Sequence, residues 1–372
     1  MKPRLVVVGP LPPPIHGVAV STSLILENEA VNDLFDVVHF DTSDHRTRET
    51  LGRWDLMNVY LAIKHSVLLL RDLGSPKGVV YLAVSGGLPG FLRDSFLIHV
   101  ARLRGWKVAG HFRNGDFHLL LRRQPRPIRW WIGKTLDRMD GAGVLGEGIK
   151  NSYSEFLSPE RMTVVPNGTP DAAWTDRRRP SDITRILFLS NLRRRKGVVE
   201  TMEAATLCLS RGYRAMFTFA GDFEDETLER ELRRLADPYE DRIEFLPPVT
   251  GPAKDELYRS ADVFVFPPVE PEGHPRVVLE AMAAGLPVVS TARGAIPETI
   301  VDGVGGIVLD DPEPERLASC LSGLIADQNL RTKMGTAARE RFLETFTEEA
   351  AGRRLAGWLQ SVASSLHPAG RR

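Results

Sequence analysis

The chain has 372 residues, which is too long for one compact core and is about right for two domains of ordinary size. Hydrophobic residues make up 42% and charged residues 26%, and 48 Lys and Arg residues balance 48 Asp and Glu residues, so this globular composition does not indicate a nucleic acid as partner. The two cysteines, Cys208 and Cys320, lie far apart and lack metal-site spacing, which argues against a disulfide framework.

The first element of the chain is an apolar run at residues 5–8. It reaches Gly9 and Pro10 too soon to be a secretory signal, and it is better interpreted as a buried strand. No uninterrupted apolar run along the sequence is long enough to span a membrane. We therefore expect a cytoplasmic protein that is still able to associate peripherally with the inner face of the plasma membrane.

Short β-branched runs alternate with amphipathic helical stretches in both halves of the chain, which is typical of parallel sheets with helical crossovers. The expected strands are residues 5–8, 37–40, 78–82, 107–110 and 143–145 in the first half, and 185–189, 215–220, 243–245, 263–266, 287–290 and 306–308 in the second. We predict two doubly wound, Rossmann-like α/β domains that face each other across a cleft. Ligands in such domains lie beyond the carboxyl ends of the strands.

The domain boundaries follow from a polar segment that contains Asn167, Gly168 and Pro180 and is interpreted as a linker. We place the first domain at residues 1–170, the linker at 171–184 and the second domain at 185–347. The final segment, 348–372, is expected to contain one helix at residues 348–366, whose apolar side is formed by Leu355, Trp358, Leu359 and Val362.

A strongly basic stretch lies between Arg93 and Arg138, with 11 basic and 3 acidic residues. Its central part mixes cations with large rings: Arg122, Arg123, Arg126, Arg129, Trp130 and Trp131. Basic segments with tryptophan suit an anionic bilayer surface. The alternative is that both tryptophans pack inside the domain and the arginines are solvated. The sequence leaves both interpretations open.

The most informative stretch is residues 269–289, VEPEGHPRVVLEAMAAGLPVV, which places Glu272 and Glu280 on either side of a loop and helix start. Pro275 suits the first turn of a helix, and Gly285 suits its end. A strand, a glycine-containing loop and a helix start favour an anion site, with phosphate as its natural occupant. A carboxylate at Glu280 is suited to the hydroxyls of a ribose. The alternative is that Glu272 caps the helix and Glu280 is solvated.

This stretch resembles the E-x7-E signature of retaining glycosyltransferases of family 4, which have the two-domain GT-B fold. Glu272 and Glu280 have the required spacing, whereas Glu270 does not. Other stretches that resemble the family follow in the expected order over nearly the whole chain: Asn167–Gly168, Ser190 to Gly197, Gly221–Asp222, Leu257 to Asp262 and Gly294 to Glu298. Together these matches are specific, although each alone is weak.

The resemblance implies a donor site in the second domain. Glu272 would contact the transferred sugar and Glu280 the ribose, while Lys196 and backbone groups at Gly273, His274, Arg276 and Val277 would hold the diphosphate. Many family members have an arginine where this chain has Asn191, so Arg193, Arg194 or Arg195 would supply the second cation, and Arg193 is preferred. The alternative, a solvated charge run, is the better interpretation for two of the four residues 193–196.

In the first domain, residues 12–17 resemble the glycine loop of the family, with His16–Gly17 in place of two glycines, and Gly17 would approach the donor. His111 follows the fourth expected strand and matches a family histidine that binds a sugar hydroxyl, although an isolated histidine is more often structural. The resemblance also implies that the terminal helix crosses back to the first domain, which would bind the acceptor.

The resemblance therefore implies a retaining, metal-independent transferase without a cofactor. It would move a sugar from a nucleoside diphosphate, with UDP favoured over GDP, to a hydroxyl of a lipid-linked or cell-surface glycan intermediate in polysaccharide biosynthesis. Two alternatives remain. One is an enzyme with a small soluble acceptor, and the other is a non-catalytic GT-B subunit of a glycan-assembly complex, which the departure at Asn191 supports. Glu272, Glu280 and Lys196 argue against the second alternative.

Overall fold

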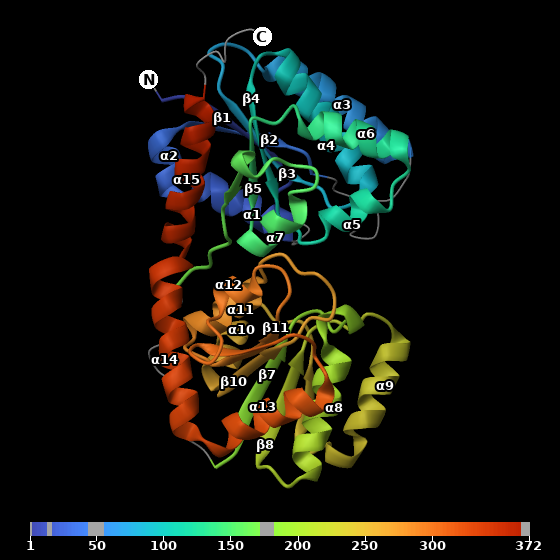
Figure 1. The fold of residues 1–372 in the computed structure, drawn as a ribbon, viewed down its shortest axis with the longest axis vertical. Coiled ribbons are helices and arrows are strands. Elements are labelled where there is room, and N and C mark those ends of the chain that lie inside the picture. Colours follow the sequence, from blue (N-terminus) through green and yellow to red (C-terminus); the bar gives the residue numbers. More distant parts are fainter. Residues whose placement is uncertain (1, 13–16, 44–55, 172–181, 366–372) are drawn as a thin grey trace. The chain divides into compact units, whose positions relative to one another are not determined.

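The computed structural model describes residues 2–12, 17–43, 56–171 and 182–365. The chain divides into two compact units (Figure 1). The first unit contains Met1–Pro166 together with Glu349–Arg372, and the second contains Asn167–Glu348. In the described ranges each unit is built on one six-stranded parallel sheet.

The sheet of the first unit has the strand order β2-β1-β3-β4-β5-β6. Every strand predicted for this half is present, and the apolar runs of β1, β3 and β4 are buried on both faces. Strand β6 was not predicted, because its three residues are too few to give a pattern. The strands are β1 (Arg4–Gly9), β2 (Asp36–Asp41), β3 (Val79–Val84), β4 (Lys107–Phe112), β5 (Gly141–Val144) and β6 (Met162–Val164).

The helices of the first unit lie in two layers, because right-handed crossovers that run in opposite directions along a sheet cover opposite faces (Figure 1). One layer contains α1 (Gly17–Glu27), α2 (Glu29–Leu34) and the terminal helix α15 (Glu348–Ser364). The other contains α3 (Leu56–Asp72), α4 (Leu88–Leu103) and α6 (Arg126–Leu136). The remaining helices are α5 (Phe117–Arg122) and α7 (Glu147–Tyr153).

Helix α15 supplies part of the core of the first unit. The four apolar residues predicted for one side of it are buried, and they share a cluster with Leu5, Val7 and Tyr81 of β1 and β3. The indole of Trp358 reaches the middle of the sheet, where β5 approaches it with Gly143. A Cβ at that glycine would lie 2.9 Å from the indole, so the glycine makes room for the tryptophan.

The second unit repeats this architecture with the strand order β12-β11-β10-β7-β8-β9. All six predicted strands are present, as β7 (Thr184–Leu189), β8 (Ala215–Ala220), β9 (Ile243–Leu246), β10 (Val263–Phe266), β11 (Val288–Thr291) and β12 (Gly306–Leu309). The helices are α8 (Val198–Ser210), α9 (Glu226–Ala236), α10 (Pro252–Ser260), α11 (Arg276–Ala283), α12 (Ile296–Thr299), α13 (Pro314–Ala326) and α14 (Gln328–Thr345).

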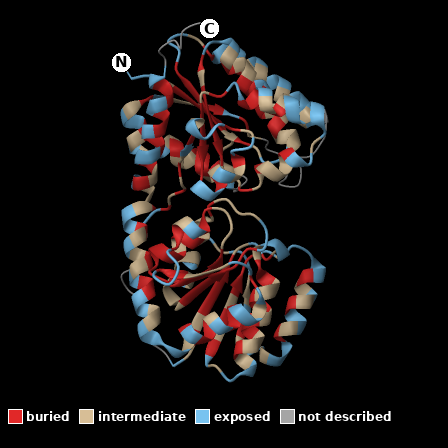
Figure 2. Cartoon of the chain, in the orientation of Figure 1, coloured by how far each residue is buried: buried red, intermediate tan, exposed pale blue. Residues whose placement is uncertain are grey.

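In this second sheet, the strand order reverses between β7 and β10, which are hydrogen-bonded neighbours. Such a switch point leaves a crevice beyond the carboxyl ends of the two strands, because their crossover helices lie on opposite faces. The strands themselves are buried, whereas the connecting segments are largely exposed (Figure 2). Part of the predicted linker, residues 172–181, lies outside the described residues.

Candidate functional site

The loops that follow β7 and β10 are joined at the switch point of the second sheet. The carbonyl oxygen of Arg195 accepts hydrogen bonds from the backbone N–H groups of Val269, at 3.1 Å, and Glu270, at 3.3 Å. Gly197 has a φ of 78°, and a Cβ there would lie 1.9 Å from the carbonyl oxygen of Pro267. Only glycine fits this left-handed conformation and this contact without displacing the backbone.

The loop after β11 holds the same segment from its other side. Gly294 has a φ of 57°, and a Cβ there would lie 2.0 Å from the carbonyl oxygen of Glu272. The N–H of Ala295 donates to the carbonyl oxygen of Gly273 at 2.9 Å, and the guanidinium of Arg293 donates to that of Val269 at 3.0 Å. Loop 267–275 is therefore held between two neighbouring loops, and this fixes the backbone that carries Glu272.

Glu272 forms an ion pair with Lys196, which belongs to the short helical turn Arg194–Lys196 in the loop after β7. The two side chains are 12% and 16% exposed, and the ammonium group also lies 5.7 Å from the centre of the Phe266 ring. Two residues that are far apart in the sequence are thus brought together by adjacent parallel strands. An ammonium group and a carboxylate meet where a small anionic ligand of an α/β sheet is expected.

Glu280 lies on α11 and is held by two residues of α10. Its carboxylate accepts a hydrogen bond from the Lys254 ammonium at 2.7 Å and another from the Tyr258 hydroxyl at 2.9 Å. Its side chain is 14% exposed, so the interpretation of Glu280 as a solvated residue is wrong. Burial raises the pKa of Tyr258 well above its ordinary value, and the neighbouring carboxylate raises it further, so the hydroxyl stays protonated and donates.

Helix α11 begins at Arg276, one residue later than predicted, and Pro275 is its N-cap. No side-chain hydrogen bond from this N-cap closes the helix terminus, and no acidic residue lies in its first turn. The helix therefore presents the partial positive charge of its N-terminus without a carboxylate in that turn, a position suited to an anion. Gly285, with a φ of 65°, follows the last turn as predicted.

The side chain of His274 faces the interior. Its Nδ1 accepts a hydrogen bond from the backbone N–H of Asn167 at 3.0 Å, and its Nε2 lies 2.9 Å from the hydroxyl of Thr299. The amide of Asn167 donates to the carbonyl oxygen of His274 at 2.7 Å, and the ring packs against Phe346. His274 therefore links Asn167, the first residue of the second unit, to loop 267–275. The predicted contact of His274 with a ligand would be made by its backbone, because its side chain faces the interior.

The basic residues of the loop after β7 have different surroundings. Arg194 forms an ion pair with Glu231, and Arg195 is exposed. Arg193 is half-buried, and within the described part of the chain its guanidinium has no hydrogen-bond or ion-pair partner. Asn191 is exposed at the start of the loop. Arg193 therefore remains the preferred second cation.

The residues predicted in the first unit are placed as follows. Gly17 is the first residue of α1 and is exposed, and a Cβ at this position would meet open space. Residues 13–16 lie outside the described ranges.

His111 is buried in β4, where Nδ1 lies 2.9 Å from the hydroxyl of Tyr81 and Nε2 lies 3.2 Å from the carbonyl oxygen of Val165. A sugar hydroxyl can reach this ring only by replacing one of these partners, so the predicted role of His111 stays a prediction.

The basic stretch of the first unit divides into inward and outward residues. Trp131 packs edge-on against Phe91, with ring centres 6.0 Å apart, and is half-buried, so its predicted role at a surface stays a prediction. Trp130 is 65% exposed, and the neighbouring Arg123, Arg126 and Arg129 are exposed as well. Arg122 is exposed too, but forms an ion pair with Glu155.

Two residues of the site were not selected from the sequence. Lys254 and Tyr258 are one helical turn apart on α10, and both reach Glu280. Tyr258 lies in the stretch Leu257 to Asp262 that resembles the family, but neither that stretch nor the i, i+4 spacing with Lys254 specifies a contact with Glu280. Among the residues that the structure describes, no group of three His, Cys, Asp or Glu side chains is arranged to hold a metal ion.

The sequence of the second unit matches a known family. Residues 175–341 fit the family model described as "Glycosyl transferases group 1". This part of the chain is a group 1 glycosyltransferase domain. Loops 190–197 and 267–275, with Lys196, Glu272 and Glu280, all belong to that domain.

Curated relatives match this chain over part of their own length. A putative colanic acid biosynthesis glycosyltransferase of Salmonella typhimurium is 30% identical over 216 residues, which cover 55% of this chain and 52% of the relative. A D-inositol 3-phosphate glycosyltransferase of Pseudarthrobacter chlorophenolicus is 30% identical over 261 residues, which cover 65% of this chain and 59% of the relative. The chain thus spans between half and three fifths of the length of these two relatives.

Solved structures extend the likeness to the whole fold. HepE of Anabaena, solved in complex with UDP, has a TM-score of 0.75 at 16% identity, covering 96% of this chain and 100% of its own. Sucrose-phosphate synthase of Thermosynechococcus elongatus has a TM-score of 0.73 at 16% identity, covering 97% and 100%. The predicted fold class, GT-B with two doubly wound α/β domains, is confirmed.

Proposed function

We propose that this protein is a retaining glycosyltransferase of family 4 that moves a sugar from a nucleoside diphosphate to a hydroxyl acceptor. The observation that carries the proposal is the placement of Lys196, Glu272 and Glu280 at the switch point of a group 1 domain. UDP is favoured as the nucleotide, and a protein of similar fold supports this choice, since HepE was solved in complex with UDP and with UDP-glucose.

In the proposed reaction, Glu280 binds the ribose hydroxyls, while Lys196, with Arg193 as a second cation, and the first amides of α11 bind the diphosphate. Cations and oriented N–H groups favour departure of a diphosphate, because negative charge develops on it in the transition state. The bond between the sugar carbon and the diphosphate oxygen breaks, and a bond to the acceptor oxygen forms on the same face of the sugar. The acceptor proton passes to the departing phosphate oxygen, and the proposed reaction includes neither a metal nor a cofactor.

Glu272 is proposed to contact the transferred sugar. Before the donor binds, its carboxylate is paired with Lys196. A diphosphate that binds this lysine competes with the carboxylate for the same ammonium. The carboxylate is then left beside the sugar, where it can accept hydrogen bonds or face the positive charge that develops on the sugar carbon.

The first unit is proposed to bind the acceptor, a lipid-linked or cell-surface glycan intermediate of polysaccharide biosynthesis. One relative supports a carbohydrate pathway, since it is a putative colanic acid biosynthesis glycosyltransferase. Two other functions are compatible with the same fold: transfer to a small soluble acceptor, and a non-catalytic role in a glycan-assembly complex.

The test is release of nucleotide from UDP-, GDP- and ADP-sugars by the purified protein, without acceptor and with EDTA. We expect slow release from one donor, and loss of release in Glu272→Gln, which removes the charge and keeps the size of the side chain. Glu270→Gln is the matched control, because Glu270 is exposed and lies two residues away. Equal activity of the two variants would show that Glu272 has no role in the reaction.

Absence of release would be followed by direct binding of the three nucleotides, measured by calorimetry. Binding of one nucleotide that is lost in Glu280→Gln would indicate an enzyme that requires its acceptor. No binding of any nucleotide would refute the proposed transferase and leave the non-catalytic role.

A further inference from the structure

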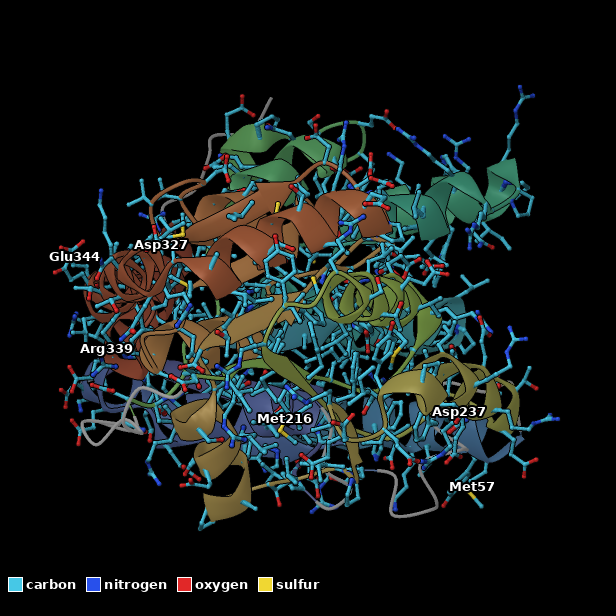
Figure 3. All side chains as sticks on the ribbon, turned by 90° about the horizontal axis from the view of Figure 1, so that it is seen from below. Met57, Met216, Asp237, Asp327, Arg339 and Glu344 are labelled. Atoms are coloured by element: carbon cyan, nitrogen blue, oxygen red, sulfur yellow. The ribbon has the colours of Figure 1, made fainter. Side chains whose placement is uncertain are left out.

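Helix α3 of the first unit has an exposed apolar stripe. Met57, Tyr60, Ile63, Val67 and Leu70 follow one another at intervals of three or four residues, and each is an exposed large side chain. At about 100° per residue, they fall within an arc of about 140°, while the buried Leu69 lies on the opposite side. Ile63 and Val67 are 59% and 60% exposed. Figure 3 shows Met57 at the margin of the view, with its side chain directed outwards.

The neighbouring helices continue this apolar surface. Helix α3 packs beside α4, and α4 packs beside α6, so the outer sides of the three helices belong to one layer of the unit (Figures 1 and 2). Helix α4 contributes Phe96 and the 78% exposed Leu103, and α6 contributes Trp130. An exposed set of large apolar side chains on adjacent helices is unusual on a soluble protein and indicates an interaction site.

Most of the charged residues on the same three helices are basic. Their sequences contain seven basic residues, Lys64, Arg71, Arg93, Arg102, Arg126, Arg129 and Lys134, and only two acidic ones, Asp72 and Asp94. Asp94 is buried and bound to Arg93, and Arg102 is bound to Asp140 outside these helices. On α3, Lys64 and Arg71 fall within the arc of the apolar stripe, so cations and apolar groups face outwards together.

We propose that the outer sides of α3, α4 and α6 form a docking face for an anionic lipid bilayer. A helix that presents large apolar residues with Lys and Arg on the same side lies in a membrane surface, with its apolar groups among the acyl chains and its cations at the lipid phosphates. A second copy of this chain fits the face less well, because a two-fold contact would bring like charges together. In the described ranges no helix is long and apolar enough to cross a membrane.

The proposal goes beyond sugar transfer, and its test needs neither donor nor acceptor. Full-length protein is floated with vesicles of phosphatidylcholine alone and with vesicles that also contain phosphatidylglycerol. We expect binding to the anionic vesicles only, weakened by salt. Replacement of Ile63 and Val67 by serine should reduce the partition coefficient at least about tenfold. Replacement of Arg126 and Arg129 by glutamate should reduce it at least about 25-fold, since each cation contributes roughly a fivefold gain.

Matched controls come from the second unit. Arg230→Glu with Arg234→Glu makes the same charge change on the exposed side of α9, and Leu343→Ser removes an exposed leucine from α14. Both controls should bind vesicles about as well as the wild type, with circular dichroism confirming that every variant is folded. The proposal is overturned if the α3 and α6 variants bind like the wild type or if anionic vesicles bind no protein. A dimer in sedimentation that dissociates on replacement of Ile63 and Val67, without vesicle binding, would assign the face to a second copy instead.

Discussion

Removal of one hydroxyl group tests whether Glu280 is held as the structure indicates. Tyr258 is fully buried, and its hydroxyl donates to the Glu280 carboxylate at 2.9 Å. A hydrogen bond to a charged group contributes about 1.5–3 kcal/mol, and the upper part of that range applies, because the carboxylate is 14% exposed and water can replace the hydroxyl only in part. For Tyr258→Phe we therefore expect a loss of about 2–3 kcal/mol in the free energy of unfolding of the second unit.

A loss of this size is measurable by calorimetry. In a unit of this length, 1 kcal/mol corresponds to about 2–4 °C, so the melting temperature of the second unit should fall by about 4–12 °C. Tyr239→Phe is the control, because the Tyr239 hydroxyl has no hydrogen-bond partner among the described residues of the unit. A shift in Tyr258→Phe of less than about 1 °C, or no larger than that of the control, would refute the reasoning. UDP binding should also weaken in Tyr258→Phe, because Glu280 would be held by Lys254 alone.

Three further predictions concern the fold. Gly197→Ala should destabilise the protein by several kcal/mol, since its Cβ would strike Pro267, whereas Gly212→Ala, with a φ of 82° and open space, should cost only about 1–2 kcal/mol in chemical denaturation. Burial is the main cause, and the nearby Arg113 the second cause, of a pKa of His111 that lies well below its ordinary value. The unfolded chain therefore binds a proton more tightly than the folded chain, and the free energy of unfolding should decrease as the pH falls below about 6.5. In His111→Gln the slope of melting temperature against pH should be smaller. Trp358→Ala should lower the free energy of unfolding by about 3–5 kcal/mol in calorimetry, and Trp358→Phe by less.

The strands were predictable from the sequence, because a strand buried on both faces has to be a short, nearly continuous apolar run. Eleven of the twelve strands were predictable from short apolar runs, and β6 is the exception, since its three residues are too few to give a pattern. The face that each helix buries was less predictable. Trp130 and Trp131 are adjacent in the sequence, yet one is exposed and the other packs against Phe91. Neither composition nor local spacing distinguishes two adjacent residues of the same type.

The candidate site was predictable only where a local motif specified it. The spacing of Glu272 and Glu280 is readable in the sequence, but their partners are not, because Lys196 is 76 residues from Glu272 and Lys254 is 26 residues from Glu280. Adjacency of β7 and β10 brings the first pair together, and packing of α10 beside α11 brings the second. Partners of this kind follow from the strand order and helix packing, which a single sequence does not provide.

The two ion pairs explain how a site built for a charged ligand can be stable without it. Each acid at this site has its own lysine, so neither a carboxylate nor an ammonium group is left unpaired at a position where water reaches only a small part of the side chain. In the proposed reaction, a diphosphate takes Lys196, and Glu272 loses its cation at the moment when the sugar beside it is bound. The positive charge that develops on the sugar carbon then becomes the new partner of the carboxylate. The exchange makes Glu272 more stabilising in the transition state than in the bound ground state, which is the condition for an effect on the rate of transfer.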